Sequence, residues 1–320
     1  MNPLASTGDE RSRGGSDPGP VYLVTSADQP ELGADDQLLH QALLAVGVPV
    51  TVAVWTDPDV AWHSATACVI RSVWDYHLHP ERFIRWLDQA SKVTTVLNPP
   101  RLVTWNLHKR YLIGLAAAGI PTVETVWITP GSNADVRQLL DDMGWETALL
   151  KPAVSASAWL TGKVGCGGAE GQRLLGQILG HCDAMLQPYL ASVDRDGEVS
   201  VIVIDGAVRH GVRRQSALTG GIEATRQGSP HELTPEERSL AERIVGLLPE
   251  QPLYARVDLL RDDADRLLLG ELELVEPVLY LRHDHRTLDE LTTAIRRHAC
   301  HQTAGPAPTF GTRAPLGAHA

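Results

Sequence analysis

The sequence predicts an α/β protein: alternating helices and strands come first, and a part built mainly from β-hairpins follows. Short β-rich apolar runs alternate with helical patterns over the first 150 residues, and two later pairs of β-rich runs are joined by short acidic turns. Hydrophobic residues make up 43% of the chain and charged residues 21%, which is typical of a globular protein. Its 320 residues are enough for two or three domains.

The N-terminal part alternates strands and helices. We expect strands over Val21–Thr25, Pro49–Trp55 and Ala67–Ser72. A helical pattern through Leu38–Leu44 ends near Gly47, and a second helix is expected over Pro80–Ala90. This order predicts a small doubly wound α/β domain with its functional loops at the carboxyl ends of the strands.

A second α/β block follows this domain. We expect helices over Lys109–Ala118 and Ala134–Met143, and strands over Thr122–Ile128 and Ala148–Lys151. The short segment Gly165–Gly168 has no P-loop lysine, so we interpret it as a turn.

The remaining part predicts two antiparallel strand pairs and one helix. Glu198–Ile204 and Val208–Arg214 flank Asp205-Gly206, a strong hairpin signal. Thr234-Pro-Glu-Glu begins a helix that runs to about Leu248. The second pair, Tyr254–Leu260 and Leu267–Leu274, is separated by an acidic turn.

Composition excludes several classes of function. The chain carries 28 basic and 39 acidic residues, a formal charge of −11, which argues against a nucleic-acid partner. The longest apolar stretch, Leu43–Trp55, is shorter than the ~20 residues that a membrane span needs, and the N-terminus has no apolar segment typical of a signal peptide. The four cysteines lie far apart without a CxxC pair, so we expect a reduced, cytoplasmic protein.

Charged residues alternate along the last strand pair. Arg256 and Asp258 share one face of their strand, and Glu271 and Glu273 share one face of the partner strand. Three carboxylates on one sheet face repel one another unless a cation neutralises them, and hard oxygen ligands suit Mg²⁺. The alternative is an exposed strand face with solvated acids.

A series of motifs resembles the ATP-grasp superfamily of carboxylate–amine ligases in order and rough spacing. These motifs are Lys109, Lys151-Pro152 at a strand end, Gln187–Leu190, Gly197-Glu198, the Asp205-Gly206 hairpin and the Arg256-x-Asp258…Glu271-x-Glu273…Pro277 pattern. The last pattern is similar to that of D-alanine:D-alanine ligase and bacterial glutathione synthetase. Arg71–Tyr76, Leu97–Lys109 and Glu271–Pro277 most resemble a glutathione-synthetase-like group that includes the O-ureido-serine cyclo-ligase of cycloserine formation.

The resemblance covers residues 20 to about 285 and implies an ATP-grasp fold, with an N-terminal doubly wound α/β domain, a central lobe and a C-terminal lobe. We accordingly expect a disordered leader over 1–19, an N-terminal α/β substrate domain over 20–105, a central lobe over 106–186, a C-terminal lobe over 187–301 and a disordered tail over 302–320.

The resemblance also implies a nucleotide site. Lys109 and Lys151 would reach the ATP phosphates from opposite lobes, which is informative because the chain has only four lysines. The backbone of Gln187 to Leu190 would bind the adenine edge, and Glu198 would accept hydrogen bonds from the ribose hydroxyls. For each lysine alone, the alternative is a solvated surface residue.

For the reacting groups, the resemblance implies that Asp258, Glu271 and Glu273 hold one or two Mg²⁺ ions, or Mn²⁺. Arg256 would stabilise charge that develops at the acyl centre. Many members of the superfamily have asparagine where Glu273 stands, and the extra carboxylate is expected to tighten metal binding. The loop after Lys151 lacks the glycines of many such loops, although Ser155 and its neighbours could still cover the phosphates.

Substrate recognition is expected just after the third strand. The residues there combine a guanidinium, a carboxylate and two aromatic rings, a set that suits an amino acid: Arg71, Ser72, Trp74, Asp75 and Tyr76. The alternative is that the rings pack between domains and the charges pair beside them. Arg213, Arg214 and Arg226 either contact a substrate carboxylate or the γ-phosphate or form a solvated charge run.

The function implied is an ATP-dependent ligase that joins small amino-acid substrates through an acyl phosphate, releases ADP and phosphate, and acts in the biosynthesis of an amino-acid-derived metabolite. Two alternatives remain: an intramolecular cyclo-ligase acting on an amino-acid derivative of the O-ureido-serine type, and a non-catalytic nucleotide-binding regulatory protein. Small amino acids are the expected partners, without nucleic acid or membrane, and a homodimer is compatible with the sequence.

Overall fold

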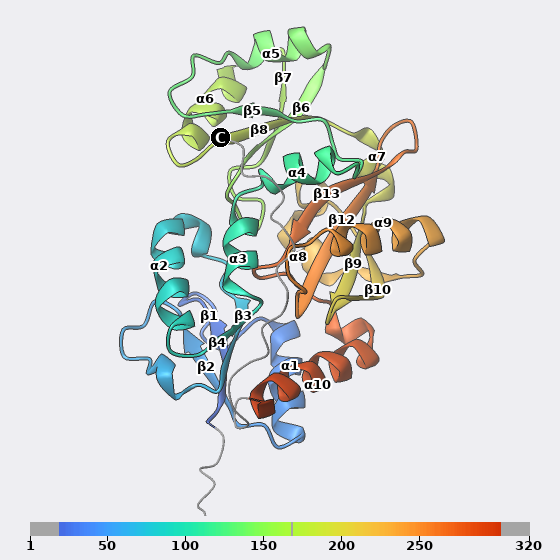
Figure 1. The fold of residues 1–320 in the computed structure, drawn as a ribbon. Helices are drawn as coiled ribbons and strands as arrows, with labels where there is room; N and C mark the ends of the chain where they lie inside the picture. The colour runs from blue at the N-terminus through green and yellow to red at the C-terminus, as the bar shows by residue number, and fades with distance from the viewer. Residues whose placement is uncertain (1–18, 168, 302–320) are drawn as a thin grey trace, which may run out of the picture.

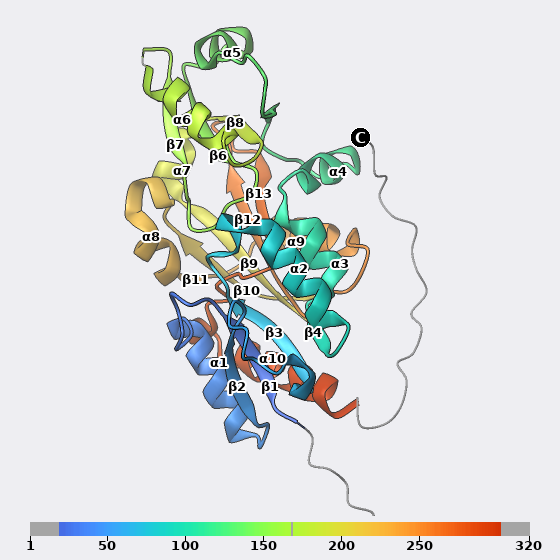
Figure 2. The same ribbon diagram turned by 90° about the vertical axis from the view of Figure 1, so that its left-hand side faces the viewer.

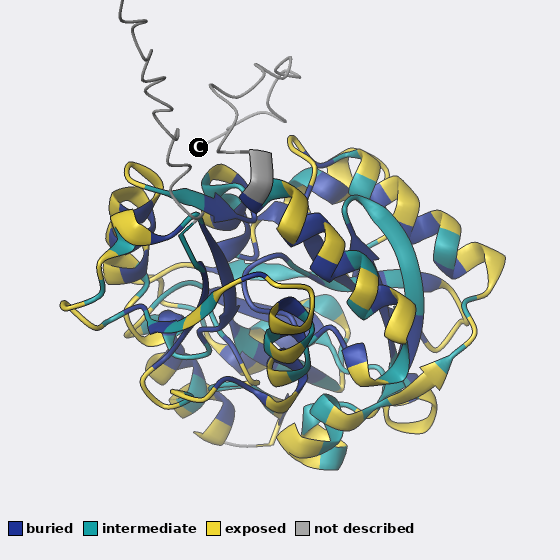
Figure 3. Cartoon of the chain, turned by 90° about the horizontal axis from the view of Figure 1, so that it is seen from below, coloured by how far each residue is buried: buried dark blue, intermediate teal, exposed yellow. Residues whose placement is uncertain are grey.

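Three β-sheets and the helices that cover them make up the fold in a computed structural model, which describes residues 19–167 and 169–301 (Figure 1). Apart from Gly19, the predicted leader lies outside the described residues, and so does the tail over 302–320. Buried residues lie mainly on the strands and on the inner faces of the helices (Figure 3). None of the described helices is long and apolar enough to cross a membrane.

The first sheet is fully parallel and confirms the doubly wound prediction. Its order is β2 (Val50–Val54), β1 (Val21–Thr25), β3 (Ala67–Ser72) and β4 (Thr95–Leu97). Alternate residues of β1 face different cores, because Val21 and Leu23 pack with α1 (Ala34–Ala45), whereas Tyr22 and Val24 pack with α2 (Pro80–Ser91). The two faces of the sheet are therefore covered by different helices.

The C-terminal helix returns to this first sheet. Helix α10 (His285–His301) packs against α1, so the two ends of the described chain lie side by side (Figures 1 and 2). Leu291 and Ile295 of α10 share one buried cluster with Leu39 and Leu43 of α1. Helix α10 thus packs with the N-terminal sheet, although it lies in the segment 187–301 that we predicted as the C-terminal lobe. The predicted domain boundaries stay predictions.

The central sheet is antiparallel and carries the second block of the chain. Its order is β5 (Val126–Ile128), β8 (Ala184–Pro188), β6 (Thr147–Pro152) and β7 (Gly162–Gly165). Helices α5 (Val136–Met143) and α6 (Ala169–Leu179) cover it. Helix α5 begins at Asp135, which accepts a hydrogen bond from the Gln138 N–H, and ends at Gly144 in the left-handed conformation.

The third sheet contains both predicted hairpins. Its order is β11 (Ser229–His231), β10 (Ala207–Arg214), β9 (Glu198–Ile204), β12 (Tyr254–Arg261) and β13 (Leu267–Glu273), all antiparallel. Helix α9 (Pro235–Gly246) covers one face and begins with a reciprocal capping box between Thr234 and Glu237.

Several elements were not predicted from the sequence. The sequence patterns missed β4, β7, β8, β11, α3 (Pro100–Leu107), α6, α7 (Ala191–Asp196), α8 (Ala217–Gln227), α10 and three short 3₁₀ helices at Trp62–Ser64, Tyr76–Leu78 and Leu281–His283. Most of these are short or rich in glycine and polar residues, so their periodicity is weak. Strand β5 is also shorter than expected, whereas Cys166 and Gly167 do form a turn.

A buried asparagine joins the first sheet to the third. Asn98, at the end of β4, donates from its amide nitrogen to the carbonyls of Tyr254 and Leu274, at 2.8 Å each. Its amide oxygen accepts hydrogen bonds from the backbone N–H groups of Leu253 and Tyr254. The Tyr254 hydroxyl in turn donates to the Ile70 carbonyl of β3. These contacts fix the hairpin of the third sheet against the N-terminal domain.

We expect Asn98→Leu to lower the free energy of unfolding by about 3–5 kcal/mol, because four buried backbone groups would lose their partner. Urea unfolding followed by circular dichroism measures this. The exposed Asn133, changed to leucine in parallel, is the control and should change stability by less than about 0.5 kcal/mol. Equal effects of the two substitutions would contradict the assignment.

Candidate functional site

A cavity of about 220 Å³ is lined by residues of the central and third sheets and by the segment that follows β3 of the first sheet. The β12–β13 hairpin contributes one wall, β6 and β8 contribute another, and the segment after β3 closes the end nearest the N-terminal domain. Both polar and apolar side chains line it. Most of the residues predicted for chemistry meet here, although they come from several separate parts of the chain.

The hairpin wall has the alternation that the sequence predicts. Arg256 lies opposite Glu273 and Asp258 lies opposite Glu271 in the antiparallel register, and all four residues line the cavity. A register shift follows Asp258, where the strand pair is irregular. One face of this strand pair therefore presents three carboxylates and one guanidinium to the cavity.

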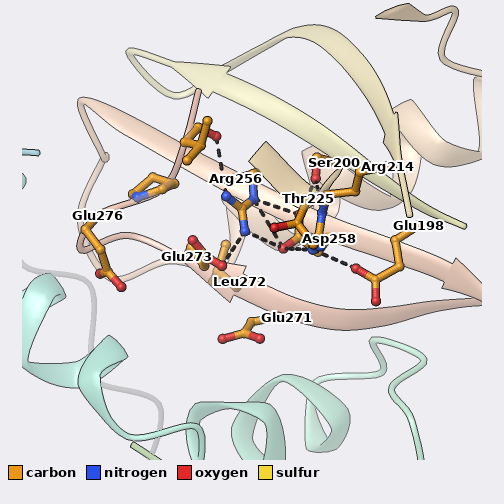
Figure 4. Close-up of polar contacts among 12 residues, drawn as sticks. Glu198, Ser200, Arg214, Thr225, Arg256, Asp258, Glu271, Leu272, Glu273 and Glu276 are labelled. Carbon is orange, nitrogen blue, oxygen red and sulfur yellow. Dashed lines mark hydrogen bonds and ion pairs between the residues drawn. The ribbon is translucent and has the colours of Figure 1, made fainter. Parts of the chain in front are cut away.

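Two arginines bind Asp258 (Figure 4). Arg256 donates from Nε to Asp258 Oδ1 at 2.9 Å and from Nη2 to Oδ2 at 2.9 Å. Arg214, at the end of β10, donates to Oδ2 at 2.8 Å, and the Ser200 hydroxyl donates to Oδ1 at 2.7 Å. Arg256 also contacts Glu273, and Arg214 pairs with Glu198 at 2.6 Å. The arginines thus link four strands into one charge network.

Burial and charge shift the pKa values of these acids in opposite directions. Burial acts to raise the pKa of Asp258, but Arg214 and Arg256 outweigh it and hold that pKa well below its usual range. Burial raises the pKa of Glu273 to about 7, opposed by Arg256. For Glu271, burial is outweighed by Lys109 and Lys151, and its pKa is lowered. The three acids therefore differ in how readily they lose a proton: Asp258 and Glu271 do so more readily than an ordinary carboxyl group, and Glu273 less readily.

The two lysines line the cavity but differ in what holds them. Lys109 is buried, its ammonium lies 3.1 Å from Glu271 Oε1, and it also donates to the backbone and hydroxyl oxygens of Ser155. Lys151, on β6, is half-buried and has no side-chain hydrogen bond or ion pair with the described residues. Loss of water around its ammonium lowers the pKa of Lys151, and Glu271 opposes this shift. Of these two lysines, Lys151 is therefore the one whose ammonium group has no partner among the described residues.

Two of the three residues predicted for the base and the ribose, Gln187 and Glu198, line the cavity. Gln187, on β8, is buried, lines the cavity and donates to the Thr125 hydroxyl at 2.9 Å. Glu198 lines the cavity while paired with Arg214. Leu190 follows β8 at the start of α7 and does not belong to the lining. No observation tests the roles predicted for these three residues.

The loop after β6 covers part of the cavity. Ser155, Ser157 and Thr161 line it, and Trp159 packs between the His77 and His181 rings, at 5.1 and 5.0 Å between centroids. Three residues of this loop adopt the left-handed conformation without being glycine: Ser157, Ala158 and Leu160. Such positions are strained and are found where surrounding contacts enforce them. The loop is thus held over the cavity without the glycines expected of it.

The five residues predicted for substrate binding divide into two groups. Trp74 and Tyr76 line the cavity, but Arg71, Ser72 and Asp75 do not. Arg71 is 1% exposed and pairs with Asp36 at 2.8 Å, and Ser72 donates to the same carboxylate.

Asp75 accepts a hydrogen bond from the Trp55 indole. Asp36 lies in the first turn of α1 and forms an ion pair with Arg71, the guanidinium that we predicted to bind the substrate. The structure therefore does not place Arg71, Ser72 or Asp75 at the cavity.

Three further charged residues line the cavity. Arg214 was left open between substrate contact and solvated charge, and it is buried in the network around Asp258. Arg226, at the end of α8, stacks its guanidinium 4.3 Å above the Trp74 ring. Glu276 was noticed only as part of the Glu-Pro sequence, and it is 8% exposed. The run of glutamates at 271, 273 and 276 is the signal that could have identified it.

The donor set suits Mg²⁺ by its chemistry, since Asp258, Glu271 and Glu273 offer hard oxygen ligands. The side chains are engaged elsewhere, however, and no three acidic, histidine or cysteine side chains of residues 19–167 and 169–301 come together in a form that could hold a metal ion. Both oxygens of Asp258 are occupied by arginines and Ser200. Metal binding by Asp258 would therefore require Arg214 or Arg256 to release one oxygen.

Comparison with known proteins finds relatives along nearly the whole chain. Residues 21–98 match a family described as the N-terminal domain of the D-cycloserine synthetase DcsG. The cycloserine biosynthesis protein DcsG of Streptomyces lavendulae is 31% identical over 295 residues, which cover 82% of this chain and 93% of that protein.

Solved structures show the same fold. The crystal structure of D-cycloserine synthetase DcsG has a TM-score of 0.77 and 28% identity, covering 88% of this chain and 100% of the other. D-alanyl-alanine synthetase A from Vibrio cholerae has a TM-score of 0.65 and 12% identity, covering 89% and 98%. At that identity the similarity shows the fold alone, and it confirms the predicted ATP-grasp fold.

We expect the two lysines to contribute differently to folding. Lys109→Met should lower the free energy of unfolding by about 2–4 kcal/mol, because Glu271 would keep a largely desolvated charge without its partner. Lys151→Met should leave stability unchanged within about 1 kcal/mol or raise it, since this ammonium has no partner to lose. Urea unfolding in the absence of nucleotide measures both, and a larger loss for Lys151→Met would contradict this.

Proposed function

The chain belongs to the DcsG family of ATP-grasp ligases, and we propose that it uses ATP to close a ring within one amino-acid derivative, giving a cycloserine-type product. The family is enzymatic and forms C–N bonds with ATP and Mg²⁺, so a non-catalytic role is set aside. The observation that carries the site proposal is the convergence of Lys109, Lys151 and the four charged residues of the β12–β13 hairpin on one cavity. Ligation of two separate amino acids is the second candidate.

A nucleotide site is the second part of the proposal. We propose that Lys109 and Lys151 contact the phosphates as point charges, and that Lys151 supplies the cation not already neutralised by the protein. Strand β8 and the segment after it, Gln187 to Leu190, would offer backbone groups to the base. Glu198 would accept hydrogen bonds from the ribose, which requires that it share its carboxylate with Arg214.

Asp258, Glu271 and Glu273 are the residues that we propose to hold Mg²⁺. When bound, the ion would screen the repulsion between the triphosphate and the substrate carboxylate. Glu271 and Glu273 face the cavity from β13, and each is already held by a cation, Lys109 or Arg256. The number of ions, and the use of Mn²⁺ in place of Mg²⁺, are further parts of this proposal.

The chemistry then proceeds in two balanced steps. The substrate carboxylate attacks the γ-phosphorus of ATP, the bond to ADP breaks, and an acyl phosphate forms. In ring closure on an O-ureidoserine, the nitrogen bonded to the side-chain oxygen attacks the acyl carbon and loses its proton to solvent, and inorganic phosphate leaves with the bonding electrons. After these two steps, water hydrolyses the carbamoyl group from that nitrogen and releases carbon dioxide and ammonia. In the ligation of two separate amino acids, the amine of the second one is the attacking nitrogen and no carbamoyl group is lost.

Asp258 and Glu273 hold the Arg256 guanidinium in place. Its remaining N–H groups would therefore not need to reorient in order to stabilise the negative charge that develops on the acyl oxygen. The protein's own contribution is thus positioning and charge compensation.

Relatedness to DcsG supports ring closure within one substrate molecule, since that protein is named for cycloserine biosynthesis. The aromatic side chains of Trp74 and Tyr76 at the end of the cavity are suited to a small, partly apolar substrate. Action in the cytoplasm and assembly as a homodimer remain predictions from the sequence.

We expect the purified protein with ATP, Mg²⁺ and an O-ureidoserine to release ADP and to form a product from one substrate molecule. Coupled ADP detection and mass spectrometry of the product measure this. Amino acids supplied singly and in pairs serve as the comparison. A product that contains two amino-acid units would favour the second candidate, and ADP release without any amino-acid dependence would contradict both.

We expect Glu271→Gln to lower the rate of ADP release by at least about 100-fold and to raise the Mg²⁺ concentration needed for half-maximal activity. The loss of one carboxylate removes both a proposed metal ligand and the partner of Lys109. A Mg²⁺ titration of the wild type and the variant provides the measurement. Glu170→Gln, on the exposed side of α6, is the matched control and should behave as wild type. Unchanged ADP release in Glu271→Gln would make the metal assignment wrong.

A further inference from the structure

One carboxylate on the cavity wall is left without a protein partner. Glu276 lines the cavity and is 8% exposed, yet its side chain makes no hydrogen bond or ion pair with the described residues. Figure 4 shows it apart from the cluster around Arg256, without any contact drawn to its carboxylate. Burial, and then the charge of Glu273, raise the pKa of Glu276 well above its ordinary value, and Lys109, the cation that most opposes this shift, is paired with Glu271 instead. An unpaired, largely buried carboxylate is costly, and such groups are retained where a ligand supplies the partner.

The surroundings of Glu276 are not those of a metal site. Tyr76 is buried and lines the same cavity as Glu276. The Trp74 indole donates to the Glu276 backbone carbonyl at 3.3 Å, which places its ring beside the same position. A carboxylate flanked by two aromatic side chains is a suitable environment for an organic cation, which gains from both the charge and the ring faces.

A guanidinium lies over the face of the Trp74 ring. Arg226 stacks 4.3 Å above that ring, and its N–H groups make no hydrogen bond or ion pair with the part of the chain that is described. The cavity beside Trp74 therefore presents one carboxyl group, that of Glu276, and one guanidinium, that of Arg226, neither of which has an ion-pair partner among the described residues. A zwitterion, or an amino acid with an acceptor group at its other end, matches this pair.

We propose that Glu276 binds the ammonium group of the amino-acid substrate, with Trp74 and Tyr76 beside it and Arg226 facing the substrate's acceptor oxygens. This deepens the proposed function and rests on it for the class of substrate. Glu276 lines the same cavity as the hairpin residues Arg256 and Glu273, so a substrate held at Glu276 shares that cavity with the residues proposed for the reaction. Glu276 thus selects substrates with a free amino group.

Calorimetric titration of the full chain with ADP and Mg²⁺ present tests this. The probes are D-serine, D-alanine and D-cycloserine, each compared with its N-acetyl derivative, which lacks the cation. We expect the amines to bind the wild type at least about 10-fold more tightly than the N-acetyl forms.

Glu276→Gln should weaken amine binding by about 10- to 100-fold, abolish the discrimination and leave the affinity for ADP unchanged. Glu276→Asp keeps the charge and should restore part of the discrimination. Glu223→Gln, on the exposed face of α8, is the matched control and should behave as wild type.

Several results would overturn the inference: discrimination retained in Glu276→Gln, ADP affinity lost together with amine binding, or no amine probe bound by a wild type that binds ADP. Failure of the proposed function is distinguishable. If the amines bind as expected but no ring-closed product forms with ATP, the substrate reaction is wrong and the ammonium site stands. If product forms and Glu276→Gln leaves the KM for the substrate unchanged, the ammonium site is wrong and the reaction stands.

Discussion

The structure depends on the neutralisation of acids that a single strand pair brings together. The register of β12 and β13 sets Asp258 opposite Glu271 and Arg256 opposite Glu273, so the repulsion among three carboxylates is built into the fold. Arg256 compensates from the same hairpin, Arg214 from β10 and Lys109 from the start of α4 (Tyr111–Ala117). Removing Arg256 or Lys109 leaves Glu273 or Glu271 without its ion-pair partner, and removing Arg214 leaves Asp258 with one arginine in place of two, which is why the three segments must come together for the strand pair to be stable.

Sequence reasoning found this hairpin because alternation along a strand and a short acidic turn are local signals. It could not choose between Arg213 and Arg214. The Asp205-Gly206 turn pairs Ala207 with Ile204, and a regular ladder from there would set Arg213 opposite Glu198. A register shift between Val208 and Gly211 moves Arg214 to that position instead. One extra residue in the strand therefore decides which arginine reaches Asp258, and nothing in the local pattern shows where it lies.

Of the five side chains predicted for the substrate, two line the cavity and three do not. The carboxyl end of β3 does lie near the cavity, as parallel α/β topology implies, and Trp74 and Tyr76 do line it. Arg71 turns instead to Asp36, which lies on α1 and far from it in the chain. Pairing between side chains of different elements is a tertiary property, so a charged residue next to a strand end carries no local mark of whether its partner is the protein or a ligand.

The charges around the cavity show what a ligand must bring. The whole lining of the cavity contains equal numbers of basic and acidic residues. The five basic ones are Lys109, Lys151, Arg214, Arg226 and Arg256, and the five acidic ones are Glu198, Asp258, Glu271, Glu273 and Glu276. These formal charges cancel, so the wall offers no net positive charge to a triphosphate, and neutralising it falls largely to ions that bind with the nucleotide. Seven of these ten charged residues form ion pairs within the protein, whereas Lys151, Arg226 and Glu276 have no ionic partner among the described residues. Two free cations and one free anion complement a phosphate group, an acceptor oxygen and an ammonium group, which together describe a nucleotide beside an amino acid.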